Sequence, residues 1–372
     1  MPAQSEQRCT SIATSSAWGM SWPVHLGQSM DTEPENRGMG SVLQERFHCQ
    51  ITFRVPCLPL VDSAFSSQMQ IRAYLFLSTT AACWGANTVF AKMAVDEVSP
   101  MLLTMLRWLG VVMLVWVLAH RGVKREWAVI KPKLGYLLAM GGLGLAIFNA
   151  LFFVAAHRTT ALNMGIIQGT VPVFVLLGGY LLYRERVSPM QMAGVGLTLV
   201  GVILVAVEGD FRRLVALAFN VGDLMIILAC LLYSGYTLWL RQKPDVPALT
   251  WFALLATAAF VSSIPLAALE WQMGVTQWPT STAWVLLALI VLFPSFIAQV
   301  FFIRGVELLG PGRAGVFVNL VPILASLAAV GVLNEVFTWY HGVALALVLA
   351  GIAVAESFAS SQAQDTTRRP QA

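Results

Sequence analysis

The chain has 372 residues, of which 57% are hydrophobic and 11% are charged, and its formal net charge is +4. A soluble domain carries about 25% charged residues, so this composition excludes a water-soluble enzyme. The mean hydropathy is +0.71, and the apolar residues form blocks separated by short charged segments, which is typical of a polytopic membrane protein. A net charge this small gives no reason to expect a nucleic-acid partner.

Residues 1–68 do not follow this pattern. They contain scattered Pro, Ser and Gln and charges of both signs, without the periodicity that buries a face or the apolar stretch of a signal peptide. We interpret them as a disordered leader, or as a start assigned too early with Met69 as the first residue. A regulatory tail is the alternative.

Ten apolar segments follow, each about 20 residues long, the length of a helix that crosses a ~30 Å hydrocarbon core. Because apolar residues run continuously instead of alternating with period two, helices are expected and barrel strands are not. The first five predicted spans are 72–92, 100–120, 134–157, 159–183 and 187–207. A charged loop, 208–218, separates them from 220–240, 246–269, 282–303, 313–335 and 336–355, and the tail is 359–372. The predicted fold class is all-α, with ten transmembrane helices.

The positive residues orient these spans. If residue 72 is placed in the cytoplasm, most of the lysines and arginines between spans fall there too, and only Lys92, Arg158, Arg212 and Arg213 fall outside. Cytoplasmic loops carry an excess of Lys and Arg. Both termini are therefore predicted to be cytoplasmic.

The sequence repeats itself at a constant offset of 150 residues. Matched pairs include Gly85 and Gly235, Phe152 and Phe302, Pro172 and Pro322, and Glu185 and Glu335. A proline inside a span, followed thirteen residues later by a glutamate, is an improbable coincidence when both halves have it. Each repeat, 71–207 and 219–358, crosses the membrane five times, so the second must be inverted relative to the first. Inverted five-helix repeats are an architecture of transporters.

Several segments resemble one known family. These are WGANTVFAKMA in the first span, LRWLG in the second, NALFFVAA in the third, GIIQGTVPVFVLLGGYLLYRERVSPMQMAGVGLTLVGVILV across the fourth and fifth, and GDLMIILACLLYSGYTLWLR in the sixth. They resemble the EamA family of the drug/metabolite transporter superfamily, and the resemblance covers residues 70 to about 358. It implies transport of small organic metabolites, without identifying the substrate. The second half departs most from the pattern, with Asn334, Glu335 and Val336 where the first half has Arg184, Glu185 and Arg186.

Two prolines are candidate hinges. Pro172 and Pro322 lie near the middles of the fourth and ninth spans, where each removes a backbone donor and frees the carbonyl of Gln168 or Val318. Such a break survives in a membrane where neighbouring groups or a water-filled cavity satisfy it. The alternative is a pair of packing kinks.

Polar and aromatic side chains inside spans are candidates for a substrate pathway, because hydrocarbon does not tolerate polar groups without partners. They lie on three symmetry-related pairs of spans, which the resemblance places around a central cavity. The predicted pathway residues are Trp84, Asn87, Asn149, Phe152, Asn163, Gln168, Tyr233, Tyr236, Gln299, Phe302 and Asn319. The alternative for each polar residue is a hydrogen bond between helices, and for each aromatic residue an ordinary core position.

Few charges lie in or beside the spans. Arg107 is about 10 Å of helix inside the second span, and it either binds an anionic substrate group, extends outward, or pairs with Asp96 or Asp223. Three glutamates, Glu185, Glu307 and Glu335, are candidates for proton coupling, and the alternative is structural charge anchoring. We expect Asp223 to cap its helix.

Two further expectations concern partners and chemistry. Gly342, Ala346 and Ala350 form a stripe of small residues, expected to pack within the bundle or to form a dimer face. The five cysteines and five histidines show no metal-binding spacing, and no Walker A motif is present. No enzyme activity, metal or cofactor is therefore expected.

The sequence predicts a permease of the bacterial inner membrane that works by alternating access. Its expected partners are the lipid bilayer, a small-molecule substrate and, as an option, a second copy of the chain. Efflux of an amino acid or a related metabolite is the favoured function. The alternatives are transport of a sugar or nucleotide-sugar and a non-transporting membrane scaffold.

Overall fold

The computed structural model of the protein describes residues 60–185, 187–210, 212, 220–309 and 311–368. Every regular element within these ranges is helical, so the predicted all-α fold class is confirmed. Most of the predicted leader lies outside the described residues, but helix α1 (Leu60–Met93) begins inside it. The prediction of disorder is therefore wrong for residues 60–68, which belong to α1. No Gly or Pro lies between Pro59 and Gly85 to interrupt this helix.

Helices fill the predicted spans of both halves. The first half contains α1, α2 (Pro100–Ile130), η1 (Lys131–Lys133), α3 (Leu134–Gly141), η2 (Gly142–Ile147), α4 (Phe148–Ala156), α5 (Ala161–Gln168), α6 (Val171–Tyr183) and α7 (Pro189–Ala206). The second half contains α9 (Val221–Trp239), η3 (Leu240–Gln242), α10 (Ala248–Gln272), α11 (Ser281–Ile290), η4 (Val291–Ile297), α12 (Ala298–Leu309), α13 (Pro311–Val318), α14 (Val321–Leu333) and α15 (Trp339–Arg368).

Several long apolar helices identify this chain as a multi-pass membrane protein. In the described part of the chain, six helical segments are long and apolar enough to cross a membrane: Pro100–Ala156, Ala161–Tyr183, Pro189–Ala206, Val221–Gln242, Ala248–Gln272 and Ser281–Leu309. Two shorter apolar helices, Val321–Leu333 and Trp339–Ala355, accompany them. Helices α2 to α4 count as one segment because no non-helical residue separates them.

Local sequence signals set many helix ends. Ser188 and Gln191 form a capping box at the beginning of α7, and the side chain of Thr160 accepts a hydrogen bond at the beginning of α5. The expectation that Asp223 caps α9 is wrong. Asn220 is the cap, and its side chain accepts from the backbone N–H of Gly222. Asp223 instead lies in the first turn of α9, where it is fully buried.

Both halves are interrupted at equivalent places. A π-helical turn, η2 or η4, divides the third segment of each half. The fourth segment breaks into α5 and α6 in the first half, and into α13 and α14 in the second. It then ends at a residue with φ of 55°, Arg184 or Asn334. These pairs keep the sequence offset, so the duplication extends to helix irregularities.

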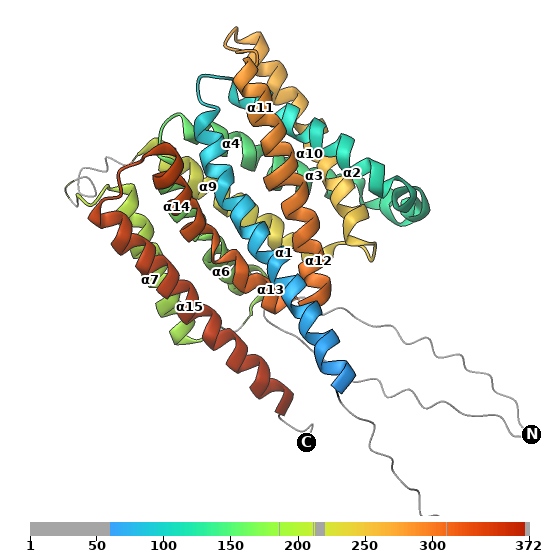
Figure 1. The fold of residues 1–372 in the computed structure, drawn as a ribbon, viewed down its shortest axis with the longest axis vertical. Helices are drawn as coiled ribbons and strands as arrows, with labels where there is room; N and C mark the ends of the chain where they lie inside the picture. Colours follow the sequence, from blue (N-terminus) through green and yellow to red (C-terminus); the bar gives the residue numbers. More distant parts are fainter. Residues whose placement is uncertain (1–59, 186, 211, 213–219, 310, 369–372) are drawn as a thin grey trace, which may run out of the picture.

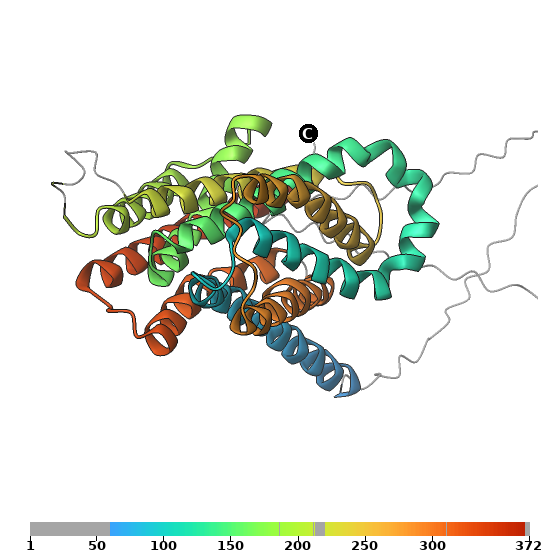
Figure 2. The ribbon, with the colours of Figure 1, turned by 90° about the horizontal axis from the view of Figure 1, so that it is seen from above.

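The first helix of each half packs against helices of the other half. Helix α1 packs against α12 and α14, while α9 packs against α4 and α6. Figure 1 shows α7 beside α15 at one edge of the bundle and α2 beside α10 at the other. Seen from above, α1 and α12 lie next to each other although they come from different halves (Figure 2). Helices α2 and α7 therefore pack against their own repeat mates, whereas α1 and α9 pack against helices of the opposite half.

Helix α15 uses another face than the sequence suggests. Its buried residues Ala344, Val348 and Ile352 face the bundle, whereas Ala346 and Ala350 of the small-residue stripe are exposed. Packing of that stripe within the bundle is therefore wrong. The close approach to α7 uses Gly351 and Gly194 instead, since a Cβ on Gly194 would lie 2.5 Å from the Gly351 carbonyl oxygen.

Candidate substrate cavity

A cavity of about 320 Å³ lies between the halves. Residues of α1, α2, α4, α5, α6, α9, η4, α12, α13 and α14 line it. Most of the predicted pathway residues meet there: Trp84, Asn87, Asn149, Gln168, Tyr233, Tyr236, Gln299, Phe302 and Asn319. Arg107, Pro172 and Pro322 line it too. Residues distant in the sequence are thus assembled around one internal space.

Two predicted pathway residues do not line the cavity. Phe152 is a fully buried core residue that stacks edge-on against Phe153 at a ring-centroid distance of 6.1 Å. Asn163 belongs to a polar cluster near the beginnings of α5, α9 and α15. Each of these residues lies on a helix that lines the cavity, but its side chain faces a neighbouring helix. The position of a residue in the sequence does not show which way its side chain points.

Other lining residues have weaker signals in the sequence. Trp108 follows Arg107, and Phe148 precedes Asn149, so each lies beside a residue that polarity singles out. Pro294 and Ser295 lie in η4. A proline with a serine inside an apolar span resembles the signal that identifies Pro172. Apolar residues such as Phe252 and Val306 carry no comparable signal.

The prolines lie where helices begin anew. The hydrogen-bonding pattern of an α-helix stops at Gly169 and Thr170, whose N–H groups bond three residues back to Ile166 and Ile167. Pro172 lies in the first turn of α6, and Pro322 lies in the first turn of α14. The prediction of a proline in the middle of one continuous helix is therefore wrong in detail. The break precedes each proline, which occupies a position where its missing N–H is not needed.

Arg107 is buried, with 6% of its surface exposed. Its Nη1 atom donates to Oδ1 of Asn87 at 3.3 Å, and its Cζ atom lies 5.8 Å from the ring centroids of Trp108 and Phe153. The side chain does not extend outward to the surface. Among the described residues, no carboxylate forms an ion pair with it, so the expected pairing with Asp96 or Asp223 is wrong.

Some buried polar atoms around the cavity have no hydrogen-bond partner within the described residues. Among them are Nε of Arg107, Nε1 of Trp108 and Oδ1 of Asn149. The first two are donors and the third is an acceptor. Leaving such a group unsatisfied costs about 1–3 kcal/mol, so these atoms are available to a ligand.

Aromatic rings form much of the cavity wall. Trp84 and Phe302 lie 5.3 Å apart between ring centroids, and Tyr233 lies 5.2 Å from Phe148 and 5.4 Å from Tyr236. The indole N–H of Trp84 donates to the Pro294 carbonyl oxygen at 3.2 Å, which connects α1 to η4. The rings present a wide apolar surface to any molecule in the cavity.

A buried polar cluster lies at one end of the bundle. Asp223 accepts from the Thr159 hydroxyl and from Nδ2 of Asn163, the latter at 3.2 Å. Oδ1 of Asn163 lies 3.1 Å from Nε2 of His341. Since Nδ1 of His341 accepts from the Thr338 backbone N–H at 3.1 Å, Nε2 carries the proton and donates to Asn163. The cluster connects α5, α9 and α15.

The three candidate coupling glutamates lie away from the cavity lining. Glu335 accepts from the backbone N–H groups of Ala161 and Leu162, both at 2.8 Å, at the beginning of α5. Glu307 pairs with Arg304 on the surface of α12 at 2.7 Å. Each therefore has a structural contact in this conformation.

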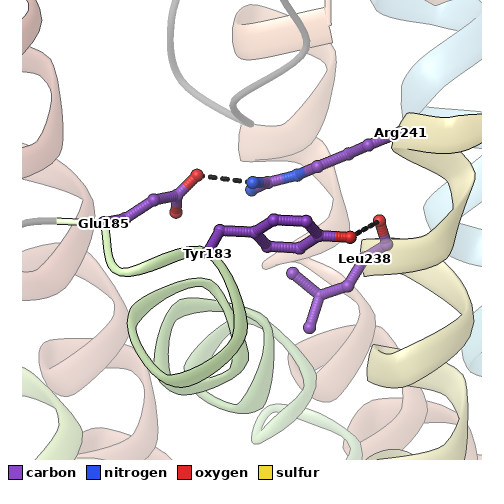
Figure 3. A network of polar contacts seen from close by, with 4 residues as sticks. All are labelled: Tyr183, Glu185, Leu238 and Arg241. Atoms are coloured by element: carbon purple, nitrogen blue, oxygen red, sulfur yellow. Dashed lines mark hydrogen bonds and ion pairs between the residues drawn. The ribbon is translucent and has the colours of Figure 1, made fainter.

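Glu185 joins the two halves. It pairs with Nη1 of Arg241 at 2.5 Å. As Figure 3 shows, the guanidinium of Arg241 lies over the Tyr183 ring, 4.9 Å from its centroid, while the Tyr183 hydroxyl donates to the Leu238 carbonyl oxygen at 3.3 Å. This cluster connects the ends of α6 and α9.

The fold and cavity define a class: a multi-pass helical membrane protein whose two related halves enclose one internal space. Residues 71–207 and 220–356 each match the EamA-like transporter family. The chain therefore belongs to the EamA-like transporter family, as its motifs predict, and it is a membrane transporter and not an enzyme.

Relatives carry similar descriptions. The chain is 24% identical to the uncharacterized transporter YetK of Bacillus subtilis, over 77% of this chain and 87% of that protein. It is 27% identical to an uncharacterized transporter of Archaeoglobus fulgidus, over 76% and 97% of the two chains. An S-adenosylmethionine/S-adenosylhomocysteine transporter of Chlamydia trachomatis is 23% identical over 52% of this chain and 59% of that one. A solved crystal structure shares the fold, with 21% identity, a TM-score of 0.53 and coverage of 78% and 98%.

Proposed function

We propose that the protein moves a small organic metabolite through this cavity by alternating access, with ten spans arranged as two inverted five-helix repeats. The observation that carries the proposal is the cavity itself, which residues of both repeats line. The exchanged packing of α1 and α9 supports a two-fold relation between the repeats. Repeats related in this way can rock around one fixed site.

The cavity lining favours access from one side. It includes Leu240 and Val306, near the ends of α9 and α12, as well as the deeper Arg107. The opposite end of the bundle is held by Glu335 on α5, by the Asp223 cluster, and by Lys92, whose Nζ donates to the Ala156 carbonyl oxygen at 2.8 Å. With both termini in the cytoplasm, this arrangement corresponds to an inward-open state.

We also propose a localisation and an oligomeric state. We place the protein in the bacterial inner membrane with both termini cytoplasmic, since most of the lysines and arginines between spans then face the cytoplasm. The exposed stripe of Ala346 and Ala350 is free to meet a second copy, which keeps a homodimer as a prediction. Cysteine-labelling from each side tests the orientation.

The alternatives have less support. A scaffold protein would pack its centre with aliphatic side chains, whereas this centre is a cavity with polar groups. A nucleotide-sugar carries several negative charges, and Arg107 is the one cation among the described lining residues. Efflux of an amino acid or related metabolite agrees with the cavity volume and with the name of the chlamydial relative.

An export assay tests the proposal. Cells with a loaded metabolite pool express the full chain, the Val306→Trp variant, or the Val261→Trp variant. Val306 lines the cavity, whereas Val261 is 47% exposed on the outside of α10. We expect mass spectrometry of the medium to find a compound released by the wild type and by Val261→Trp, but retained by Val306→Trp at equal expression. Equal release from all three would contradict a route through this cavity.

A further inference from the structure

We propose that Arg107 and Trp108 bind the carboxylate of the substrate, and that the cavity takes a small organic monoanion with an aromatic or apolar body. This inference rests on the proposed function, because it assigns a ligand to the same cavity. Of the amino acids and related metabolites proposed above, it selects related metabolites that carry a carboxylate but no ammonium group, and it excludes the amino acids themselves.

The charge of Arg107 has little compensation among the described residues. A buried ion is costly unless another charge or several hydrogen bonds compensate it. The described contacts of Arg107 comprise one bond to a neutral amide, at 3.3 Å, and two aromatic rings. A guanidinium has five N–H donors, so most of its capacity is unused. An anionic ligand would supply the missing charge and accept those donors.

A second hydrogen-bond donor lies beside Arg107 in the sequence. Trp108 has 4% of its surface exposed, lines the same cavity, and leaves its indole N–H without a partner in the described structure. A carboxylate has two oxygens that accept hydrogen bonds and suit the fork of an arginine. One carboxylate can therefore accept hydrogen bonds from both Arg107 and Trp108. A neutral hydroxyl could also accept hydrogen bonds, but it would not compensate the charge of Arg107.

The remaining wall of the cavity is rich in aromatic rings and carries no negative charge among its described residues. Within the described lining residues there is no Asp or Glu to pair with an ammonium group. The other walls present the rings of Trp84, Phe148, Tyr233 and Phe302. The vacant acceptor, Oδ1 of Asn149, suits a hydroxyl or N–H group elsewhere on the ligand. An ammonium group would find only ring faces and neutral acceptors such as Oδ1 of Asn149, whereas an anion would find the guanidinium of Arg107, so the lining favours an organic anion over a cation or a zwitterion.

Four matched probes test the charge preference. They are phenylacetate, phenylacetamide, phenethylamine and phenylalanine, which keep the ring and vary the charge. Binding to the full chain in lipid nanodiscs is measured by calorimetry. We expect phenylacetate to bind at least about tenfold more tightly than phenylacetamide, the usual scale of a charge-assisted hydrogen-bonded pair. Tighter binding of phenethylamine or phenylalanine, or no binding of phenylacetate, would overturn the inference.

Variants locate the preference. In Arg107→Gln the ratio of phenylacetate to phenylacetamide affinity should fall to about one, while Arg107→Lys should keep part of it. Arg304→Gln removes an equal charge on the exposed surface of α12, so it should keep the whole ratio. Trp108→Phe should weaken phenylacetate a few-fold and leave phenylacetamide nearly unchanged. A ratio that survives in Arg107→Gln would contradict the assignment.

The export assay separates the two proposals. If cells export a compound through a Val306-sensitive route and Arg107→Gln exports it equally well, the transport function stands and the carboxylate site does not. If the wild type neither exports a compound nor binds a probe, both proposals fail.

Discussion

Oε1 of Glu335 lies 2.8 Å from the backbone nitrogen of Ala161, from which it accepts a hydrogen bond across 174 positions of the sequence. Its other oxygen accepts from Leu162. Glu270 repeats this arrangement on α2, where it accepts from Met101, Leu102 and the Ser99 hydroxyl. A helix N-terminus has unpaired N–H groups and a partial positive charge. These carboxylates therefore cap helices from a distance.

The contact predicts the effect of removing Glu335. Glu335→Ala should lower the free energy of unfolding by about 1–2 kcal/mol, because two N–H groups of α5 lose their acceptor. Thermal unfolding in detergent measures the change. The control is Glu307→Ala, which removes an exposed pair with Arg304 and should change stability by less than about 0.5 kcal/mol. If Glu335→Ala left stability intact but abolished the pH dependence of transport, a coupling role would be favoured.

The repeat provides a matched pair of glycines. A Cβ added to Gly85 would lie 2.8 Å from the Ala325 backbone nitrogen on α14, whereas one added to Gly235 would meet nothing within 4 Å. Gly85→Ala should destabilise the protein by about 1–3 kcal/mol because two helix backbones must separate. Gly235→Ala should stabilise it by about 0.5–1 kcal/mol through helix propensity. Unfolding of the two variants side by side measures both, and equal effects would contradict the close packing of α1 on α14.

The sequence predicts the helices and the cavity better than it predicts the local contacts. Hydrophobic runs locate the spans because lipid imposes one length on every crossing. Polar residues such as Asn87 and Gln299 identify the cavity because hydrocarbon excludes them elsewhere. Both signals depend on the solvent around the helix, and neither requires knowledge of the tertiary packing.

Local contacts depend on that packing. Nothing near Glu335 in the sequence indicates that its carboxylate reaches α5, since the contact joins the two halves. Asn163 has the polarity of a pathway residue, but the rotation of α5 directs it to Asp223 and His341. The prediction that the small-residue stripe of α15 packs within the bundle is wrong for the same reason, because the bundle geometry decides which face of α15 meets α7.

The buried polar cluster predicts a large effect at Asn163. Asn163→Leu should destabilise the protein by about 1–3 kcal/mol, because Asp223 loses a donor and His341 loses an acceptor in a dry environment. A double-mutant cycle with His341→Leu should then show coupling, since that variant removes one of the orphaned groups. Additive losses in unfolding free energy would mean that the cluster does not act as a unit. Leu162→Ala tests ordinary packing at the adjacent position of α5.

The ion pair between the halves predicts a smaller and salt-dependent effect. In the pair of Glu185 and Arg241, 40% and 16% of the side chains are exposed, so solvent screens part of the attraction. A double-mutant cycle of Glu185→Gln and Arg241→Gln should give a coupling energy of at most about 1 kcal/mol that falls with added salt. Arg241→Lys should be weaker than wild type, because a lysine loses the planar contact with Tyr183. Coupling independent of salt would contradict a screened pair.

The helix breaks before Pro172 and Pro322 predict a separation between stability and transport. Each proline lies in the first turn of its helix, so replacing both with alanine should change the unfolding free energy by less than about 1 kcal/mol. The new N–H groups can bond to the carbonyl oxygens of Gln168 and Val318, which would join α5 to α6 and α13 to α14. If the breaks are hinges, export per folded molecule should fall severalfold. Pro265→Ala is the control, because that proline lies exposed within α10 and should leave export unchanged. Export equal to the control would identify the breaks as static kinks.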